Sequence, residues 1–231
     1  MIGRKHGRTG IPGPVKADPV PVILCFILIF SWNNAIPLLF TFKDRFPHLN
    51  PYWEKYGALQ RIESYPARAT LLQEGKTARN YYFIEKGCVR LWFDNNGKDT
   101  TVQFFFEKEG LSSLESFQKN IPSIFSIETI EPSVIRILPK TIFQSMLKEL
   151  DQDPEFLKAM LEISFERQRH YMNEFLSRLR DTPLQRYLNL LKKRPEIIRR
   201  VPQHYIASYL GISSVHLSRI KNRIAKKIIS G

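Results

Sequence analysis

The segment from Gln203 to Asn222 limits the possible folds of this chain more than any other part of the sequence. Its sequence is QHYIASYLGISSVHLSRIKN, in which Ala207, Gly211 and Leu217 are separated by four and then six residues. A small residue, a glycine at the point of reversal and an inward-facing leucine at this spacing predict two short helices that cross steeply over a tight turn. The pattern indicates a helix-turn-helix, and the alternative is a small helical hairpin in an unrelated core.

The second predicted helix carries polar and basic side chains on its outer face, with a single valine among them. Hydrogen-bonding and cationic groups on such a face suit the major groove of DNA. Arg219 is the candidate for a bidentate guanine contact, and Val215 can contact a thymine methyl group. Two further candidates stand at predicted helix starts, where backbone amides can bind phosphate. The predicted DNA-binding residues are Ser214, Val215, His216, Ser218, Arg219, Lys221, Asn222 and Arg223 on the helix, with Gln203 and Thr182 at helix starts.

Positive charge is concentrated in the same part of the chain. Residues 180–231 contain twelve Lys or Arg and two acidic residues, and they carry +10 of the net charge of +13. Residues 51–179 contain seventeen basic and eighteen acidic side chains, which nearly cancel. A phosphate-binding surface needs charge of one sign, whereas solvated helix faces normally mix both. The charge distribution therefore favours double-stranded DNA as the partner.

Length and composition limit the remaining possibilities. A chain of 231 residues can hold two modest domains, and 43% hydrophobic with 25% charged residues predicts a globular protein. The two cysteines, Cys25 and Cys88, are far apart in sequence and have no second ligand nearby. They predict neither a disulfide framework nor a metal site, and they fit a reducing, cytoplasmic compartment.

The middle of the chain alternates short β-rich runs with turn signals between Ala67 and Pro139. Asp94-Asn95-Asn96-Gly97 predicts a hairpin, because Asn and Gly tolerate the left-handed backbone region. A second hairpin is predicted around Glu131-Pro132-Ser133, between strands at 124–128 and 134–138. Regularly spaced short strands with glycine turns predict an antiparallel roll or barrel.

A long helix is predicted after the β-rich region. Asp153-Pro154 has the pattern of a helix start, and residues 155–180 contain no Pro or Gly. About 25 helical residues would extend about 37 Å. Thr182-Pro183 then caps the next helix, and the turn before it is a predicted hinge. A coiled-coil-like seam predicts dimerisation through Leu157, Leu161, Ser164, Gln168, Tyr171 and Phe175, flanked by a second stripe of Met160, Phe165, Met172, Leu176 and Leu179. The alternative is that both stripes are buried within one chain.

This order of elements resembles the Crp/Fnr superfamily of bacterial transcription regulators. The segment EGKTARNYYFIEKGCVRL (Glu74–Leu91) is similar to the cyclic-nucleotide-binding-like roll of that family, in which an E-G turn precedes a Y-x-I-x-x-G hairpin. RYLNLLKKRPEIIRRVPQHYIASYLGIS (Arg186–Ser213) and LSRI (Leu217–Ile220) resemble its Bacteroidetes-type branch. The resemblance covers about residues 40–228 and implies a homodimer on a pseudo-palindromic operator.

The chain departs from that family where cyclic nucleotides bind. The resemblance implies an Arg followed by Ser or Thr on the cyclic phosphate, but Ile121 and Pro122 occupy those positions. Cyclic AMP is therefore not the expected effector, and the roll either senses another small molecule or only supports the dimer. The candidate effector pocket comprises Ser112, Ser113, Glu115, Ile121 and Ser123. The family's Fnr-type cysteine cluster is absent, and scattered histidines give no haem ligand, so no cofactor is predicted.

The first forty residues do not fit this scheme. Residues 1–16 are rich in Gly, Pro and Arg, and Val20–Phe30 is strongly apolar. No small-x-small cleavage site follows, and Asn33, Asn34 and Pro37 interrupt a membrane span. An over-extended gene start is the leading explanation, ahead of a membrane-tethered regulator and of an unusual soluble extension.

The sequence predicts an α+β fold in four parts. These are an extension (1–40), an antiparallel cyclic-nucleotide-binding-like β-roll (41–150), a dimerisation helix (151–180) and a winged helix-turn-helix domain (181–231). The expected function is transcription regulation by a homodimer bound to DNA, with RNA polymerase and a small-molecule effector as further candidate partners. The alternative is an interaction protein whose basic C-terminus binds anionic surfaces such as lipid. An enzyme is not predicted, because the sequence offers no nucleophile–base pair, metal cluster or phosphate loop.

Overall fold

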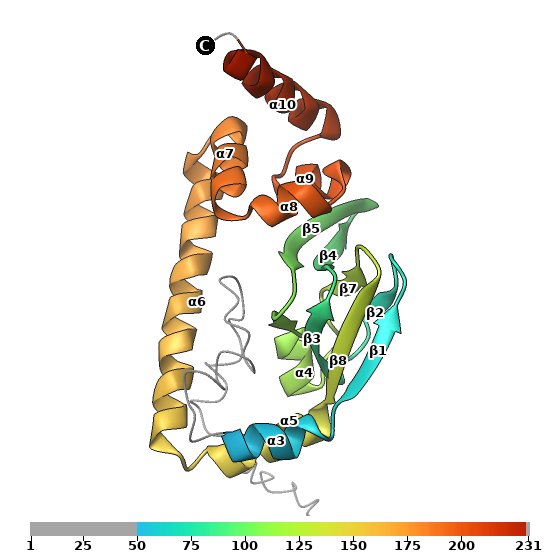
Figure 1. The fold of residues 1–231 in the computed structure, drawn as a ribbon, viewed down its shortest axis with the longest axis vertical. Helices are drawn as coiled ribbons and strands as arrows, with labels where there is room; N and C mark the ends of the chain where they lie inside the picture. Colours follow the sequence, from blue (N-terminus) through green and yellow to red (C-terminus); the bar gives the residue numbers. More distant parts are fainter. Residues whose placement is uncertain (1–49, 230–231) are drawn as a thin grey trace, which may run out of the picture.

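The computed structural model describes residues 50–229, so the predicted extension and its apolar segment lie outside the described residues. Eight strands form the first half of this region and helices form the second (Figure 1). The strands are β1 (Arg61–Tyr65), β2 (Thr70–Leu72), β3 (Asn80–Lys86), β4 (Val89–Asn95), β5 (Lys98–Phe105), β6 (Gly110–Leu111), β7 (Ser126–Thr129) and β8 (Ser133–Pro139). The helices are α3 (Asn50–Gly57), α4 (Leu114–Lys119), α5 (Lys140–Leu150), α6 (Pro154–Arg180), α7 (Pro183–Lys193), α8 (Pro195–Arg200), α9 (Gln203–Tyr209) and α10 (Ser214–Ile229).

The strands form two antiparallel four-stranded sheets, in the orders β1-β8-β3-β6 and β2-β7-β4-β5. The predicted hairpin is confirmed: Asn95 pairs with Lys98, and Asn96 and Gly97 between them have φ values of 53° and 79°. Two consecutive positive φ values suit a two-residue turn that follows the right-handed strand twist. β5 lies at the edge of its sheet, which leaves one side of its backbone without a strand partner.

The second predicted hairpin is wrong. β7 and β8 flank Glu131-Pro132-Ser133 as expected, but β7 belongs to one sheet and β8 to the other. The turn is therefore a corner between sheets. A second corner, at Gly87, lies against it, and a Cβ atom at Gly87 would approach the Ser133 Oγ to 2.2 Å. Turn residues alone do not distinguish a corner from a hairpin, because both need the same reversal of the chain.

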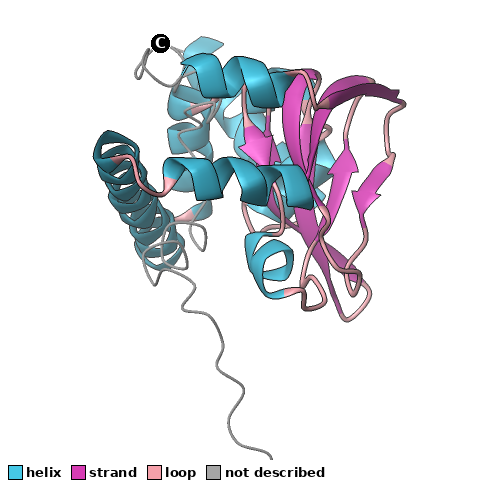
Figure 2. Cartoon of the chain, turned by 90° about the horizontal axis from the view of Figure 1, so that it is seen from below, coloured by secondary structure: helices cyan, strands magenta, loops and turns pink. Residues whose placement is uncertain are grey.

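The two sheets and the helices α4, α5 and α6 share one apolar core. Tyr81 of β3 stacks on Phe143 of α5 with ring centroids 5.4 Å apart, and Phe117 of α4 packs edge-on against Phe143 at 5.5 Å. The first turns of α6 add Phe156 and Met160 to this core. Figure 2 shows the helices gathered on one side of the strands. The roll is therefore closed by α4, which lies between its strands β6 and β7, and by α5 and α6, which follow it in the sequence.

The start of α6 is as predicted. The Asp153 carboxylate accepts hydrogen bonds from the amides of Glu155 (2.9 Å) and Phe156 (3.1 Å), and Pro154 occupies the first turn. The helix then runs without interruption for 27 residues. Thr182 caps α7 as predicted, in a capping box with Gln185. These caps fix where the long helix begins and where the chain turns at its far end.

A second apolar core joins the C-terminal helices to the roll. Its members from α7 to α10 include Tyr187, Ile197, Tyr205 and Leu217, and the roll contributes residues from its turns and from β5. The roll residues are Cys88, Phe104, Phe106 and Ile130. Described residues 181–229 contain helices and no strand, so the predicted wing has no counterpart in this part of the chain.

Candidate nucleic-acid interface, effector loop and interdomain contact

The crossing of α9 and α10 is built as the spacing of small and apolar residues predicts. Ala207 and Leu217 are buried where the helices meet, and Gly211 between them has φ of 68°. The Ile212 amide donates to the Ala207 carbonyl (3.0 Å), which closes the turn. The Ser213 Oγ accepts the amide of His216 at 3.1 Å and so caps α10, a role that sequence reasoning did not assign to it.

The outer face of α10 is exposed from Ser214 to Arg223, where its side chains are described. Val215 is 62% exposed and stands among polar neighbours, whereas Leu217 and Ile220 are buried on the opposite side of the helix. The structure brings eight predicted residues together on this helix: Ser214, Val215, His216, Ser218, Arg219, Asn222 and Arg223 are exposed, and Lys221 is half-buried. Gln203 is exposed at the start of α9, and the Thr182 hydroxyl is already used as a helix cap.

The long helix α6 exposes an apolar seam that differs from the predicted one. Leu161, Phe165, Met172, Phe175 and Leu179 are between 47% and 67% exposed, and with Gln168 they recur at spacings of four and three residues. This combines parts of both predicted stripes, because the burial of Phe156, Ala159 and Met160 against the roll sets the rotation of the helix. Leu157 is half-buried on the roll, Ser164 Oγ donates to the Met160 carbonyl (2.8 Å), and the Tyr171 side chain lies outside the described residues.

The candidate effector loop is internally hydrogen-bonded. The Ser123 and Ser113 hydroxyls are 2.7 Å apart, and the Ser112 hydroxyl donates to the Asn80 carbonyl at 2.9 Å. Glu115 is exposed and pairs with Lys119 at 2.8 Å, while Ile121 is exposed at the end of the loop. Of the candidate pocket residues, Ser113 and Ser123 lie together, while Glu115 and Ile121 are exposed, and the pocket stays a prediction.

Two polar groups of the roll and the helix after it were not identified from the sequence. Lys140 donates to Asn120 Oδ1 (2.9 Å), and burial lowers the pKa of the Lys140 ammonium. Gln103 of β5 is 2% exposed, and its Nε2 has no hydrogen-bond partner. Among the described residues no group of His, Cys, Asp and Glu side chains is arranged to hold a metal ion.

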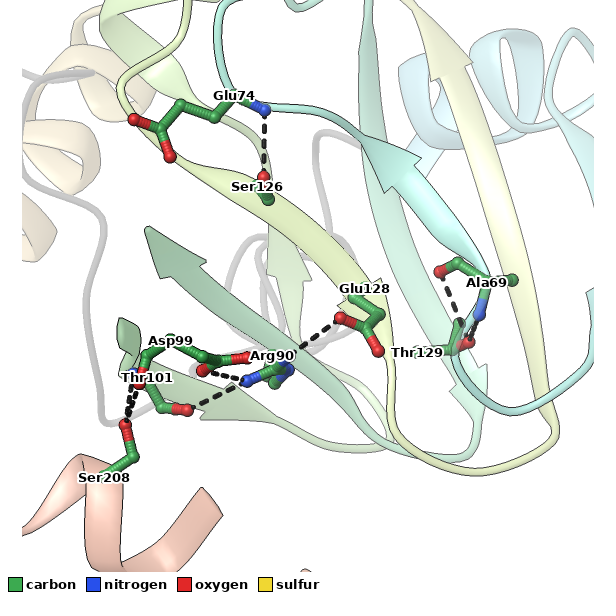
Figure 3. A network of polar contacts seen from close by, with 9 residues as sticks. All are labelled: Ala69, Glu74, Arg90, Asp99, Thr101, Ser126, Glu128, Thr129 and Ser208. Carbon is green, nitrogen blue, oxygen red and sulfur yellow. Dashed lines mark hydrogen bonds and ion pairs between the residues drawn. The ribbon is translucent and has the colours of Figure 1, made fainter. Parts of the chain in front are cut away.

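The first contact between the roll and the C-terminal helices centres on Arg90 of β4 (Figure 3). Arg90 is 2% exposed, and its guanidinium donates to both oxygens of Asp99 (2.6 Å each) and to Glu128 (2.9 Å). The ring of Tyr205 from α9 lies over the guanidinium at 3.9 Å. Ser208 of α9 completes the contact on β5.

The second contact is made by two arginines at the ends of α8. Arg200 binds both oxygens of Glu107 at 2.7 Å and also pairs with Glu131, and Arg194 lies 3.3 Å from Glu109. The Arg200 hydrogen bonds hold the pKa of Glu107 at about 2. Burial raises the pKa of Glu109 to about 7, because desolvation outweighs the attraction of Arg194.

Sequence reasoning missed this whole contact. The alternation of Val89, Arg90 and Leu91 shows that Arg90 faces away from the roll core, but no sequence pattern identifies what covers that face. In the sequence, Arg194 and Arg200 are recognisable only as members of a basic segment, and their acidic partners cannot be identified. Within residues 50–229 no helix is both long and apolar enough to cross a bilayer.

Comparisons with known proteins agree with this architecture. Residues 62–150 match the family model of the cyclic nucleotide-binding domain. No curated protein matches the chain in sequence. Among solved structures, the c-di-GMP-responsive global regulator CLP of Xanthomonas campestris is 17% identical with a TM-score of 0.61, covering 77% of this chain and 92% of that one.

Two further regulators share the fold. FixK2 of Bradyrhizobium japonicum is 18% identical with a TM-score of 0.59, covering 73% of this chain and 85% of that one. A variant of CooA from Carboxydothermus hydrogenoformans is 17% identical with a TM-score of 0.57, covering 86% of this chain and 87% of that one. The Bacteroidetes-type branch stays a prediction. Residues 62–150 therefore match the cyclic nucleotide-binding domain family, and the chain shares its fold with solved structures of Crp/Fnr family regulators.

Proposed function

We propose that the chain is a sequence-specific DNA-binding transcription regulator of Crp/Fnr type. The observation that carries the proposal is α10, which buries Leu217 and Ile220 and exposes a face of polar and basic side chains. This helix belongs to a segment with a net charge of +10. A helix of this kind enters the major groove with its N-terminal residues against base edges, while the helix before it crosses the phosphate backbone.

The residues of α10 divide into two proposed roles. Arg219 reads guanine by a bidentate contact and Val215 contacts a thymine methyl, so both contribute specificity. Lys221 and Arg223 neutralise phosphates, so they contribute affinity without sequence preference. Gln203, at the first position of α9, is a further phosphate contact.

We infer that two copies pair through the exposed seam of α6. The six seam positions lie opposite the face of α6 that packs on the roll, so a second copy can cover them without displacing the roll. Pairing there would present two α10 helices to half-sites about one helical turn apart. An effector of the roll would act by changing the separation of these helices, and RNA polymerase is a candidate partner on the operator.

The first test selects bound fragments from a random DNA pool with the purified full-length chain and titrates the winner at two salt concentrations. We expect a two-fold-symmetric motif bound at least ~10³ times more tightly than a scrambled sequence. Weak binding that depends steeply on salt and yields no motif would contradict the proposal. Equal affinity for anionic vesicles would then favour lipid docking by the basic segment.

Two variants of α10 separate the proposed roles. Arg219→Ala should weaken binding to the selected site by about 1–3 kcal/mol and relax preference at one position of each half-site. Lys221→Ala should weaken all sequences alike and reduce the salt slope. Lys148→Ala, at an exposed position of α5, is the control and should change neither quantity. Identical effects of the first two variants would contradict this assignment of roles.

Dimerisation through α6 is tested by adding charge to the seam. Phe175→Glu should convert the dimer to a monomer in sedimentation experiments, because it would bury a carboxylate in an apolar interface. Asn173→Glu introduces the same charge at an exposed position outside the seam and should leave the dimer intact. A monomeric wild-type chain, or a dimer unaffected by Phe175→Glu, would refute pairing through this seam.

A further inference from the structure

Helix α9 covers the outer edge of strand β5, where β5 has no strand partner. The Ser208 hydroxyl accepts the Thr101 amide at 2.8 Å and donates to the Asp99 carbonyl at 2.9 Å, so it satisfies two backbone groups of edge strand β5 (Figure 3). Tyr209, one residue on, packs its ring 5.4 Å from that of Phe104. The Thr101 amide is therefore protected only while α9 is docked.

Helix α8 stabilises the same contact with the roll through the arginines at its two ends. Arg200 joins the turns that carry Glu107 and Glu131, and Glu107 also accepts the Gly87 amide at 2.9 Å, so three turns of the roll meet at this arginine. Arg194 and Arg200 both lie over the ring of Phe106, at 5.4 and 4.9 Å from its centroid. The docking surface thus combines an apolar ring with ion pairs at its margin.

Glu109 is the most buried of the acids that pair with the arginines of α8. It is 8% exposed, it accepts the Phe106 amide at 2.7 Å, and Arg194 is 3.3 Å away. Arg194 is shared with Glu196 of α8. The other charged or titratable groups around it are Glu107 and Lys108 in its own turn, Glu131 and Cys88 in neighbouring turns, and Arg200 and Glu196 of α8.

We propose that the contact of α8 and α9 with the roll is a reversible latch, which protonation of Glu109 closes and ionisation of Glu109 opens. Because Ala207 and Leu217 fix α10 on α9, the orientation of α10 relative to the roll follows the state of the latch. The inference goes beyond DNA binding and does not need it, since both states are properties of the free chain.

The direction of the pH dependence of the latch follows from the pKa shifts of Glu109 and Glu107. Burial raises the pKa of Glu109 to about 7 in the closed state, and opening would hydrate the carboxylate and return its pKa toward the ordinary 4.5. Proton linkage therefore favours the open state as pH rises through 7. Glu107 has the opposite sign: Arg200 lowers its pKa to about 2, so its contribution to closing is complete above pH 4.5 and is lost toward pH 2. The latch should be most firmly closed between these limits.

The test is amide hydrogen exchange at Thr101 in the full chain, expressed as a protection factor corrected for the intrinsic pH dependence. From pH 6 to pH 8 the wild-type protection factor should fall roughly ten-fold. In Glu109→Gln, which cannot ionise, it should stay constant over this range. A constant wild-type value, or the same fall in Glu109→Gln, would overturn the proposal.

A second variant tests the latch independently, in case Glu109→Gln does not fold. Arg200→Gln should lower Thr101 protection at pH 6 several-fold, while amides of the β4–β7 ladder keep theirs. Glu115→Gln, an exposed acid paired within α4, is the matched control and should leave Thr101 protection and its pH dependence unchanged. Loss of ladder protection together with Thr101 would show unfolding of the roll and would refute a local latch. Because no DNA is present, failure here is distinct from failure of the selection experiment.

Discussion

The roll meets the helices that follow it at two contacts of different chemistry. Against the first turns of α6 it buries Phe156, Ala159 and Met160 in its own apolar core. Against α8 and α9 it combines apolar rings with ion pairs of Arg194 and Arg200, and the ring of Tyr205 lies over Arg90, whose own ion pairs stay within the roll. The first contact is built almost entirely from hydrophobic burial, and the second depends on groups that can lose or gain charge.

This difference indicates which of the two contacts can change during function. Apolar burial is insensitive to pH and salt near neutrality, so α6 should stay attached to the roll under all conditions that preserve the fold. Ion pairs are directional and respond to protonation and ionic strength. Among the described residues, we therefore expect the C-terminal helices to be the part that can reorient without unfolding the roll.

The largest expected effect tests the apolar contact. Phe156→Ala removes a buried ring from the roll core and should lower the free energy of unfolding by about 3–5 kcal/mol. Lys158→Ala, two residues away and exposed, should change it by less than about 0.5 kcal/mol. Urea denaturation measures both. A small effect of Phe156→Ala would mean that α6 is not firmly attached to the roll.

The next effect tests the buried ion pair that lies within the roll beneath Tyr205 of α9. Arg90→Ala leaves Glu128 buried without its cation and should lower the free energy of unfolding by about 3 kcal/mol. The control is Arg61→Ala, since Arg61 forms an exposed pair with Glu63 at 3.4 Å, for which a few tenths of a kcal/mol are expected. If both variants cost the same, the buried pair contributes no more to stability than an exposed one.

The pH dependence of the free energy of unfolding distinguishes the contact with α8, which contains Glu109, from the apolar contact with α6. Because the pKa of Glu109 is about 7 in the folded chain, its contribution is complete below pH 4.5 and is lost as pH rises through 7. The wild type should lose about 1 kcal/mol of unfolding free energy from this group between pH 6 and pH 8. Glu109→Gln should not show this loss. Denaturation at the two pH values checks the difference, and parallel losses in both proteins would assign the pH dependence elsewhere.

The smallest effect concerns the covered strand edge. Ser208→Ala leaves the Thr101 amide and the Asp99 carbonyl without a partner and should cost about 1 kcal/mol. Ser218→Ala, on the exposed face of α10, should have no measurable effect on stability. Equal stability of both variants would indicate that water replaces the serine at the edge.

Much of the fold could be predicted because its signals are local. Asp153-Pro154 and Thr182-Pro183 mark helix starts, Asn96-Gly97 marks a hairpin, and the Ala207–Gly211–Leu217 spacing marks a helix crossing, each through a few neighbouring residues. The corner at Glu131-Pro132-Ser133 was misjudged, because the choice between one sheet and two depends on strands far away in the sequence.

The types of the helices and strands and their order, a roll followed by helices, could be predicted from the sequence because they depend on short spacings. The concentration of positive charge in residues 180–231 follows from composition alone. Only the tertiary structure decided which stripe of α6 is exposed, because the rotation of a helix is set by the residues that its first turns bury. It likewise decided that Arg90, Arg194 and Arg200 pair with acids of the roll. Their acidic partners lie up to 93 residues away along the chain, and charge alone does not specify partners at that separation.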